Sequence, residues 1–382
     1  MAYYKIPFNR PYMTGRELNY IAEAHSCSHL AGDGPFTQRC HAWLEQQIGC
    51  RKALLTPSCT AALEMMALLL EIEEGDEVIL PSFTFVSTAN AFVLQGGVPV
   101  FVDIRPDTLN IDETRLEEAI TPRTKAIVPV HYAGVACEMD AIMTIATRHS
   151  LAVVEDAAQG AMASYRGRAL GSIGDLGALS FHETKNVISG EGGALLVNSE
   201  KFMFRAEILR DKGTNRSSFL RNEVDKYTWQ DKGSSYLPSE LTAAFLWAQF
   251  EEAEPITRFR LDLWNHYHES FEPLERRGLL RRPIIPKGCS HNAHMYYVLL
   301  APGADRAAVL AALANEGVGA VFHYVPLHDS PAGRRYGRAN GDLIVTDDLS
   351  SRLIRLPMWV GLQEADQNRV VDALTRILTF HV

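Results

Sequence analysis

Short apolar runs alternate with stretches of helical periodicity between about positions 50 and 200. Runs of this length, rich in Val, Leu, Ile and Ala, are typical of buried strands. Their alternation with helices indicates a parallel sheet covered by helices on both faces. The pattern predicts strands at 52–55, 77–80, 98–103, 126–130, 152–155, 178–181 and 194–198.

Helical periodicity predicts the elements between and after these strands. A longer helix over 240–263 carries apolar residues at helical spacing, and Pro255 inside it predicts a kink. The polar, irregular stretch 214–235 predicts an exposed arm that reaches a partner subunit. Shorter helices are predicted at 61–70, 88–94, 113–120 and 139–149.

The pattern changes after about position 250. We predict a strand at 295–300, a helix at 306–316, a strand at 319–322 and a closing helix at 364–380. With 382 residues and 47% hydrophobic content, the chain can bury a large core in more than one lobe. The expected fold is therefore α/β, with a large domain over 1–250 and a smaller C-terminal α+β domain over 251–382.

Charge and composition exclude several classes of partner. The formal net charge of -9 gives no sequence-wide attraction to nucleic acid or to an anionic membrane, and it leaves a local basic pocket open. The most apolar run, 61–70, is too short to span a bilayer, and the first ten residues carry no apolar signal segment. Six cysteines without paired metal-ligand spacing indicate a reduced, cytoplasmic protein.

Lys185 lies just beyond the predicted strand 178–181 and before a Gly-rich turn at 190–193. An isolated lysine is usually a solvated loop residue. Asp156, at the end of the predicted strand 152–155, changes this interpretation, because both residues would meet at the sheet edge where α/β proteins bind ligands. Pyridoxal phosphate needs such a pair: a lysine that forms the Schiff base and a carboxylate that keeps the pyridine nitrogen protonated.

The turn at 56–61 follows a strand and opens a helix. Its free N–H groups and the helix dipole favour a phosphate, and Ser58 and Thr60 add hydroxyl groups. A simple helix cap explains the same residues equally well, and both roles can share one place.

Two further positions near these strand ends can serve a flat cofactor. Phe85 can stack on its ring, although Phe83 competes for this role and core packing explains either residue. Gln159, three residues after Asp156, can hydrogen-bond a phenolic oxygen. An acid in the position of Asp156 can also be only a helix cap.

His323 and His328 suggest a metal site at first sight. Their spacing of five with Pro326 between them, and no third ligand nearby in the sequence, argue against zinc, so no metal is expected. Hydrogen bonding to substrate is the preferred functional interpretation, and plain packing remains open. The sequence contains no dinucleotide-binding glycine fingerprint after the first strand and no Walker motif.

Three segments in order, 56–63, 154–159 and 180–186, resemble the DegT/StrS group of fold-type I, pyridoxal-phosphate-dependent nucleotide-sugar aminotransferases. Within that group the chain is similar to members that aminate C4 of dTDP-4-keto-6-deoxyhexoses. This closer similarity is carried by Cys40 and by the segments 81–90, 130–140, 212–216 and 323–328.

The resemblance implies roles for the residues at the cofactor's ring. Lys185 would form the Schiff base and carry the proton, Asp156 would pair with the pyridinium nitrogen, and Gln159 would contact the ring hydroxyl. Phe85 would stack on the ring, where relatives often have tryptophan.

The resemblance also implies how the phosphate is held. Thr60, Ala61 and Ser180 would bind it from within the chain. Many relatives add an asparagine from the neighbouring subunit, and the comparable residue here is Ser235. The implied partners are L-glutamate, a dTDP-keto-deoxysugar and a second copy of the chain in a homodimer with active sites at the interface.

Three alternatives stay open. One is amination at C3, or of a sugar on another nucleotide carrier. Another is a related sugar 3-dehydratase, which has histidine in place of Lys185 and is therefore disfavoured. The last is a non-catalytic, cofactor-binding regulator, for which the sequence shows no helix-turn-helix appendage or basic face.

Overall fold

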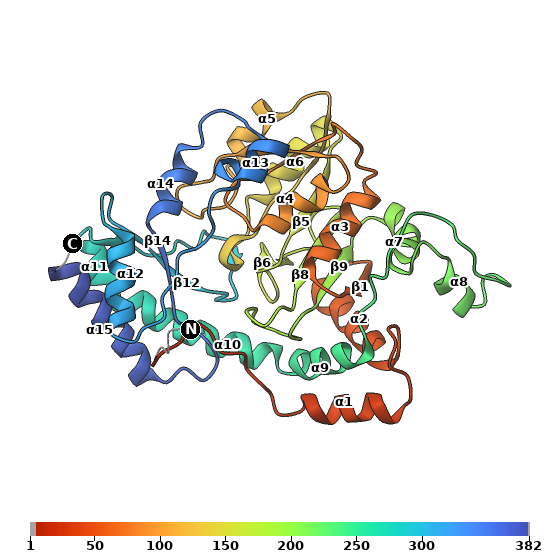
Figure 1. The fold of residues 1–382 in the computed structure, drawn as a ribbon, viewed down its shortest axis with the longest axis horizontal. Helices are drawn as coiled ribbons and strands as arrows, with labels where there is room; N and C mark the ends of the chain where they lie inside the picture. Colours follow the sequence, from red (N-terminus) through yellow and green to blue (C-terminus); the bar gives the residue numbers. More distant parts are fainter. Residues whose placement is uncertain (1–4, 381–382) are drawn as a thin grey trace.

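A computed structural model describes residues 5–380. Figure 1 shows a central sheet between helices, with a second group of elements at one end and a projecting arm at the other. The second group surrounds α10 (Ala253–Ser270), α12 (Arg306–Asn315) and α15 (Glu364–Phe380), and the arm carries α8 (Arg216–Leu220).

The main sheet has eight strands in the order β1-β9-β8-β5-β4-β2-β3-β13. All pairs are parallel except those of β9, which runs antiparallel to both β1 and β8. The connection from β8 to β9 carries no crossover helix, so the chain returns in the opposite direction. The strands are β1 (Lys52–Thr56), β2 (Glu77–Pro81), β3 (Val98–Val102), β4 (Thr124–Ile127), β5 (Ala152–Asp156), β8 (Leu176–Ser180), β9 (Gly193–Val197) and β13 (Arg338–Ala339).

Side chains alternate between two cores on opposite faces of this sheet. Leu54 and Val154 belong to the core under α3 (Cys59–Leu69) and α4 (Val86–Val93). Their neighbours Leu55 and Val153 belong to the core under α2 (Pro35–Ile48), α6 (Met139–His149) and α9 (Glu240–Glu251). Burial on both faces explains the continuous apolar runs in the sequence and confirms the predicted mostly parallel, helix-flanked sheet.

Two helices at the N-terminal end were not predicted. These are α1 (Glu17–Ser26) and α2, and both pack on α9. The signals for α2 are present in the sequence: Pro35 occupies its first turn, and Gly49 closes it with a φ of +77°.

The predicted long helix over 240–263 is two helices. α9 ends at Glu251, and α10 (Ala253–Ser270) begins two residues later. Pro255 therefore lies in the first turn of α10, where its missing N–H has no intrahelical acceptor to lose.

A second, antiparallel sheet consists of β10 (Leu280–Arg281), β12 (Tyr296–Leu300) and β14 (Leu353–Leu356). α10, α12 (Arg306–Asn315) and α15 (Glu364–Phe380) pack against it around a separate core. The predicted strand at 319–322 is wrong, because this segment pairs only through a single bridge between Val321 and Arg355. β14, which the sequence did not predict, is the strand that pairs with β12 in this sheet.

An N-terminal segment packs with the smaller sheet, and a C-terminal strand belongs to the main sheet. Ile6 bridges to Val318 and lies in the core of the smaller sheet, whereas β13 joins the edge of the main sheet beside β3. The division into domains at 250 and 251 remains a prediction, supported by the separate core. Within residues 5–380 we find no helix with the length and hydropathy needed to cross a membrane.

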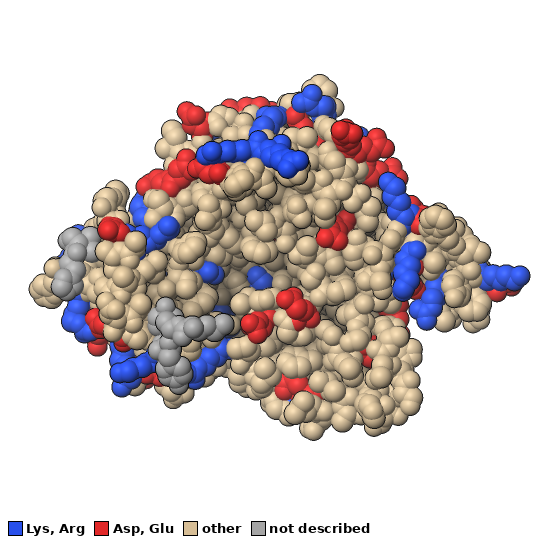
Figure 2. Space-filling view, viewed as in Figure 1, with Lys and Arg blue, Asp and Glu red and all other residues tan. Residues whose placement is uncertain are grey.

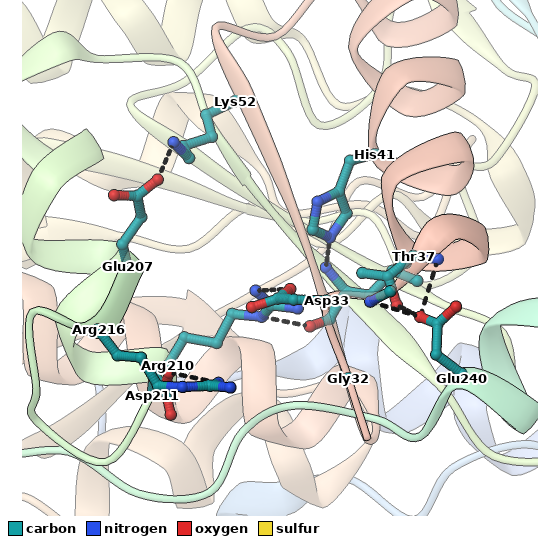
Figure 3. Close-up of polar contacts among 12 residues, drawn as sticks. Gly32, Asp33, Thr37, His41, Lys52, Glu207, Arg210, Asp211, Arg216 and Glu240 are labelled. Carbon is teal, nitrogen blue, oxygen red and sulfur yellow. Dashed lines mark hydrogen bonds and ion pairs between the residues drawn. The ribbon is translucent and has the colours of Figure 1, made fainter. Parts of the chain in front are cut away.

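Glu240, at the first position of α9, has no exposed surface. Its carboxylate accepts hydrogen bonds from the backbone N–H groups of Gly34 (3.0 Å), Phe36 (2.8 Å) and Thr37 (3.1 Å) at the start of α2 (Figure 3). The charge thus caps a helix N-terminus from a distant part of the chain. A Cβ on Gly34 would lie 2.6 Å from the Glu240 carboxylate carbon, which explains the glycine.

Arg210, at the end of α7 (Met203–Arg210), anchors the loop before α2 to the sheet. Its guanidinium donates to Asp33 at 2.7 Å and to the Leu55 carbonyl at the end of β1 at 2.9 Å (Figure 3). Glu207, one turn earlier, pairs with Arg221 of the arm at 2.9 Å. The root of the arm is therefore fixed by ion pairs to α7.

We expect Glu240→Ala to lower the free energy of unfolding by about 3 kcal/mol, because several buried N–H groups lose their acceptor. Urea unfolding followed by circular dichroism measures this change. Glu254→Ala, at an exposed position of α10, is the matched control and should stay within about 0.5 kcal/mol of the parent. Equal unfolding midpoints for the two variants would contradict the capping role.

Candidate active site

A cavity of about 720 Å³ is lined by residues from the ends of the main sheet and by residues of the smaller sheet. Figure 2 shows a hollow near the centre of the face in view, with basic side chains inside it. The predicted site residues that line the cavity are Thr60, Phe85, Asp156, Gln159, Ser180, Lys185 and His323.

Lys185 lies in the loop between β8 and β9, where its N–H donates to the His182 carbonyl at 2.8 Å. The next residue, Asn186, fixes the loop by donating to the Asn292 carbonyl at 2.7 Å. Burial lowers the pKa of Lys185, and the Arg355 charge lowers it further, while Cys59 and Asp156 oppose the shift. A lowered pKa increases the fraction of neutral, nucleophilic amine.

Asp156 ends β5 and lines the same cavity. One carboxylate oxygen accepts from the Thr88 hydroxyl at 2.6 Å, and the other accepts from the Ala158 N–H at 3.1 Å. These bonds hold the carboxylate in one orientation, as a partner for a cationic ring nitrogen requires.

Glu155, the preceding residue, points to the other face and has no exposed surface. Its carboxylate accepts from the N–H groups of Gly171 (2.9 Å), Ile173 (2.5 Å) and Gly174 (2.6 Å), and it contacts His131 Nε2 at 2.8 Å. The loop before β8 is thereby fixed to β5. Adjacent acids on one strand thus serve different purposes: Glu155 fixes the backbone and Asp156 faces the cavity.

The turn at the start of α3 is both a cap and a candidate phosphate site. Ser58 Oγ accepts from the Ala61 N–H at 3.1 Å, so Ala61 is engaged in the cap and does not line the cavity. Thr60 does line it, with its hydroxyl 2.8 Å from Ser87 Oγ. N–H groups in a first helical turn have no intrahelical acceptor, and with the Thr60 and Ser180 hydroxyls they fit a phosphate.

Gly193, the first residue of β9, lets this turn approach the sheet. A Cβ there would lie 2.6 Å from the Ser58 carbonyl oxygen. The Gly-rich segment after Lys185 therefore has a steric function at this position.

The two candidate stacking residues have different environments. Phe85 lines the cavity and is 56% exposed, whereas Phe83 is 1% exposed and packs against Tyr132. Gln159 lines the same cavity, accepting from the Ala133 N–H at 2.6 Å and donating to the Tyr324 hydroxyl at 3.0 Å. Tyr324 itself stacks on His323 at 3.6 Å between ring centroids.

His328 and Ser235 do not line the cavity of the single chain. His328 Nδ1 lies 2.7 Å from Ser82 Oγ, and its other nitrogen faces Asp329 and Asp347. Two potential metal ligands therefore lie beside His328, which the sequence spacing did not reveal. The backbone of Ser235 forms an isolated antiparallel β-bridge with Asp211 at the root of the arm.

Several cavity residues were missed in the sequence. Arg260, His294 and Arg355 come from the part of the chain after position 250, and Phe8 comes from the N-terminal segment. None follows a strand of the main sheet, so no local pattern connects them to Lys185. Tyr324, in contrast, lies in the segment 323–328 that the sequence had already singled out.

Known proteins resemble this chain over nearly its whole length. The sequence model of the DegT/DnrJ/EryC1/StrS aminotransferase family matches residues 11–375. The spore coat polysaccharide biosynthesis protein SpsC of Bacillus subtilis is 32% identical, with 98% of this chain and 97% of that protein covered. GDP-perosamine synthase of Caulobacter vibrioides is also 32% identical, with 98% of each chain covered.

Among solved structures, the aminotransferase TlmJ from Streptoalloteichus hindustanus superposes with a TM-score of 0.89 at 29% identity. The superposition covers 98% of this chain and 99% of that one. The expected fold type, family and cofactor are thus confirmed. The chain belongs to the DegT/DnrJ/EryC1/StrS aminotransferase family and is a sugar aminotransferase that uses pyridoxal phosphate.

Proposed function

We propose that the enzyme transfers the amino group of L-glutamate to C4 of a dTDP-4-keto-6-deoxyhexose, as a dTDP-4-amino-4,6-dideoxygalactose transaminase does. The products would be a dTDP-4-amino-4,6-dideoxyhexose and 2-oxoglutarate. The observation that carries the chemistry is the placement of Lys185 and Asp156 in one cavity. The choice of sugar and nucleotide rests on the sequence similarity at 81–90, 130–140, 212–216 and 323–328.

Pyridoxal phosphate, when bound, supplies the electron sink and carries the amino group between the two substrates. Lys185 would hold it and would move the proton between the substrate carbon and the cofactor carbon, a task favoured by the lowered pKa of its amine. Asp156 would keep the ring nitrogen protonated, and Gln159 would hydrogen-bond the ring hydroxyl.

The remaining contacts follow from the cavity lining. Thr60 and Ser180, with N–H groups of the α3 turn, would bind the phosphate, and Phe85 would stack on the ring. Ala61 would contribute only through the capped turn. His323 is the candidate for a sugar hydroxyl, whereas the expected substrate contact of His328 is not retained, because its ring lies outside the cavity lining.

The active enzyme is proposed to be a homodimer. The arm exposes large apolar side chains on a single chain, with Trp229 83% exposed and Tyr227 and Leu220 more than half exposed. A second copy that covers this surface would bring Ser235 towards the partner's cofactor.

The reaction is tested by incubating the holoenzyme with L-glutamate and dTDP-4-keto-6-deoxyglucose. We expect 2-oxoglutarate and a product whose NMR spectrum places the new amine at C4. A GDP-linked 4-keto sugar and a dTDP-linked 3-keto sugar are the comparison substrates, and a higher kcat/KM for either would replace the proposed substrate. No 2-oxoglutarate with any of these sugars would refute the choice of glutamate.

We expect Lys185→Ala to abolish steady turnover and the absorbance band of the lysine-bound cofactor, because no other amine is in place to hold it. Absorbance spectra of the purified variant before and after addition of L-glutamate measure both effects. Lys201→Ala is the control, because Lys201 is exposed and follows the end of β9, whereas Lys185 precedes its start. An unchanged spectrum in Lys185→Ala would mean that another residue holds the cofactor.

Asp156→Asn should lower kcat by about 100- to 1000-fold while the cofactor stays bound, because an amide of the same shape cannot stabilise a protonated ring nitrogen. Steady-state kinetics and the cofactor content of the purified variant separate these effects. Asp140→Asn, at an exposed position of α6, should match the parent enzyme. Wild-type kcat in Asp156→Asn would place the ring partner elsewhere.

A further inference from the structure

Arg355 extends from β14 into the cavity that contains Lys185. Its backbone is paired with Val321, since its N–H donates to the Val321 carbonyl at 2.7 Å and its carbonyl accepts from the Val321 N–H at 3.1 Å, and Tyr297 of β12 is its partner on β14's other side. The side chain therefore starts from a fixed position in the sheet. A guanidinium on such a support is suited to fixed recognition of a ligand.

The guanidinium of Arg355 has few partners. One terminal nitrogen donates to the Phe322 carbonyl at 3.2 Å, and the group lies 4.8 Å from the ring centroid of Phe8. Its Nε is buried and has no hydrogen-bond partner among residues 5–380, and no carboxylate of that part of the chain lies within 4.0 Å. Arg355 is thus a largely enclosed cation without a counter-ion.

Other buried arginines of this protein are differently placed. Arg210 has Asp33 as its counter-ion at 2.7 Å. Arg260, which also lines the cavity, donates to the Ala293 and His294 carbonyls at 3.0 and 2.6 Å. Removing a cation from water without a partner is unfavourable by several kcal/mol. Of the two arginines that line the cavity, Arg260 has carbonyl acceptors, whereas Arg355 has a buried Nε without an acceptor in the described part of the chain.

The charges around the cavity also favour an anion. Its lining includes the cations Lys185, Arg260 and Arg355 and the carboxylates Asp156 and Glu191. Asp156 is engaged by Thr88 and Ala158, as described above, and the Glu191 side chain is largely exposed. Lys185 and Asp156 are assigned to the cofactor, so the cations Arg260 and Arg355 are the charged groups inside the cavity that remain for a ligand.

Arg355 and Lys185 line the same cavity, and the Arg355 charge contributes to the lowered pKa of the Lys185 amine. An oxyanion on Arg355 would therefore belong to a substrate that shares the cavity with the reacting amine. The carboxylate of an amino acid meets this condition, and so does the diphosphate of a compact nucleotide sugar.

We propose that Arg355 binds an oxyanion of a substrate through its unfilled N–H groups, and that this oxyanion is a carboxylate of the amino donor or the diphosphate of the nucleotide sugar. A planar guanidinium presents paired N–H groups to such oxygens, which an ammonium does not. This inference rests on the proposed function for the identity of the two substrates. It assigns Arg355 to substrate binding, separate from the residues that hold the cofactor.

The test uses the holoenzyme, because the two halves of a transamination can be measured apart. In the first half-reaction, L-glutamate is added to the pyridoxal form of the enzyme. In the second, dTDP-4-keto-6-deoxyglucose is added to the pyridoxamine form. Both are followed by absorbance. Calorimetric titration with glutarate and with dTDP measures binding without reaction. The variants are Arg355→Gln, which removes the charge, and Arg355→Lys, which keeps the charge and loses the paired N–H groups.

We expect Arg355→Gln to raise the apparent Kd of the substrate in one half-reaction by about 10- to 100-fold and to change the other little. The apparent Kd of Arg355→Lys should lie between those of Arg355→Gln and the parent enzyme. Weakened glutamate and glutarate binding identifies the carboxylate, and weakened sugar and dTDP binding identifies the diphosphate. Arg369→Gln, on the surface of α15 beside Asp366, is the control. Cofactor content and thermal unfolding temperature check that each variant is folded and loaded.

Two results would overturn the inference. One is unchanged Kd values in both half-reactions for an Arg355→Gln variant that is folded and contains the cofactor. The other is loss of the cofactor itself from both Arg355 variants. The proposed function fails in a different way. It fails if the parent enzyme does not react with L-glutamate, whatever the variants do.

Discussion

The buried carboxylate of Glu155 is the interaction on which the arrangement of this site depends. A fully enclosed negative charge is tolerated only where donors surround it, and here the donors are the N–H groups of the loop that leads into β8 together with His131 after β4. This requirement permits little freedom in the loop. The hydrogen bonds to Glu155 therefore hold β8 beside β5. The position of β8 in turn determines where Ser180 and the Lys185 loop lie relative to Asp156.

Enclosed charges elsewhere follow the same rule. Glu240 is surrounded by N–H groups at the start of α2, and Asp103 accepts from the N–H groups of Val345 and Thr346 at 3.0 and 2.8 Å. Anions that shape the fold are thus satisfied by the chain itself. Arg355 in the cavity is not, because its buried Nε has no acceptor in the described part of the chain, and this contrast distinguishes groups that build the protein from a group that can bind a ligand.

Much of the fold and the part of the candidate site at the strand ends could be predicted from the sequence, because both depend on local patterns. Strands buried on both faces appear as continuous apolar runs, and Asp156, Ser180 and Lys185 follow such runs directly. The N-terminal helices were missed although Pro35 and Gly49 mark the ends of α2. The segment 319–322 has a strand-like composition but pairs at one residue only, and its tertiary neighbours decide this. Arg355 and Arg260 reach the cavity through packing between distant segments, which no local pattern records.

Phe8 and Asn9 line the same cavity as Arg355 and Met358. The main sheet can be completed except for its edge strand β13 while much of the remaining chain is still being synthesised, but the cavity wall cannot. Segments from both ends of the chain thus close the cavity, and a chain truncated before β14 would have Lys185 in place but would lack the wall that includes Arg355.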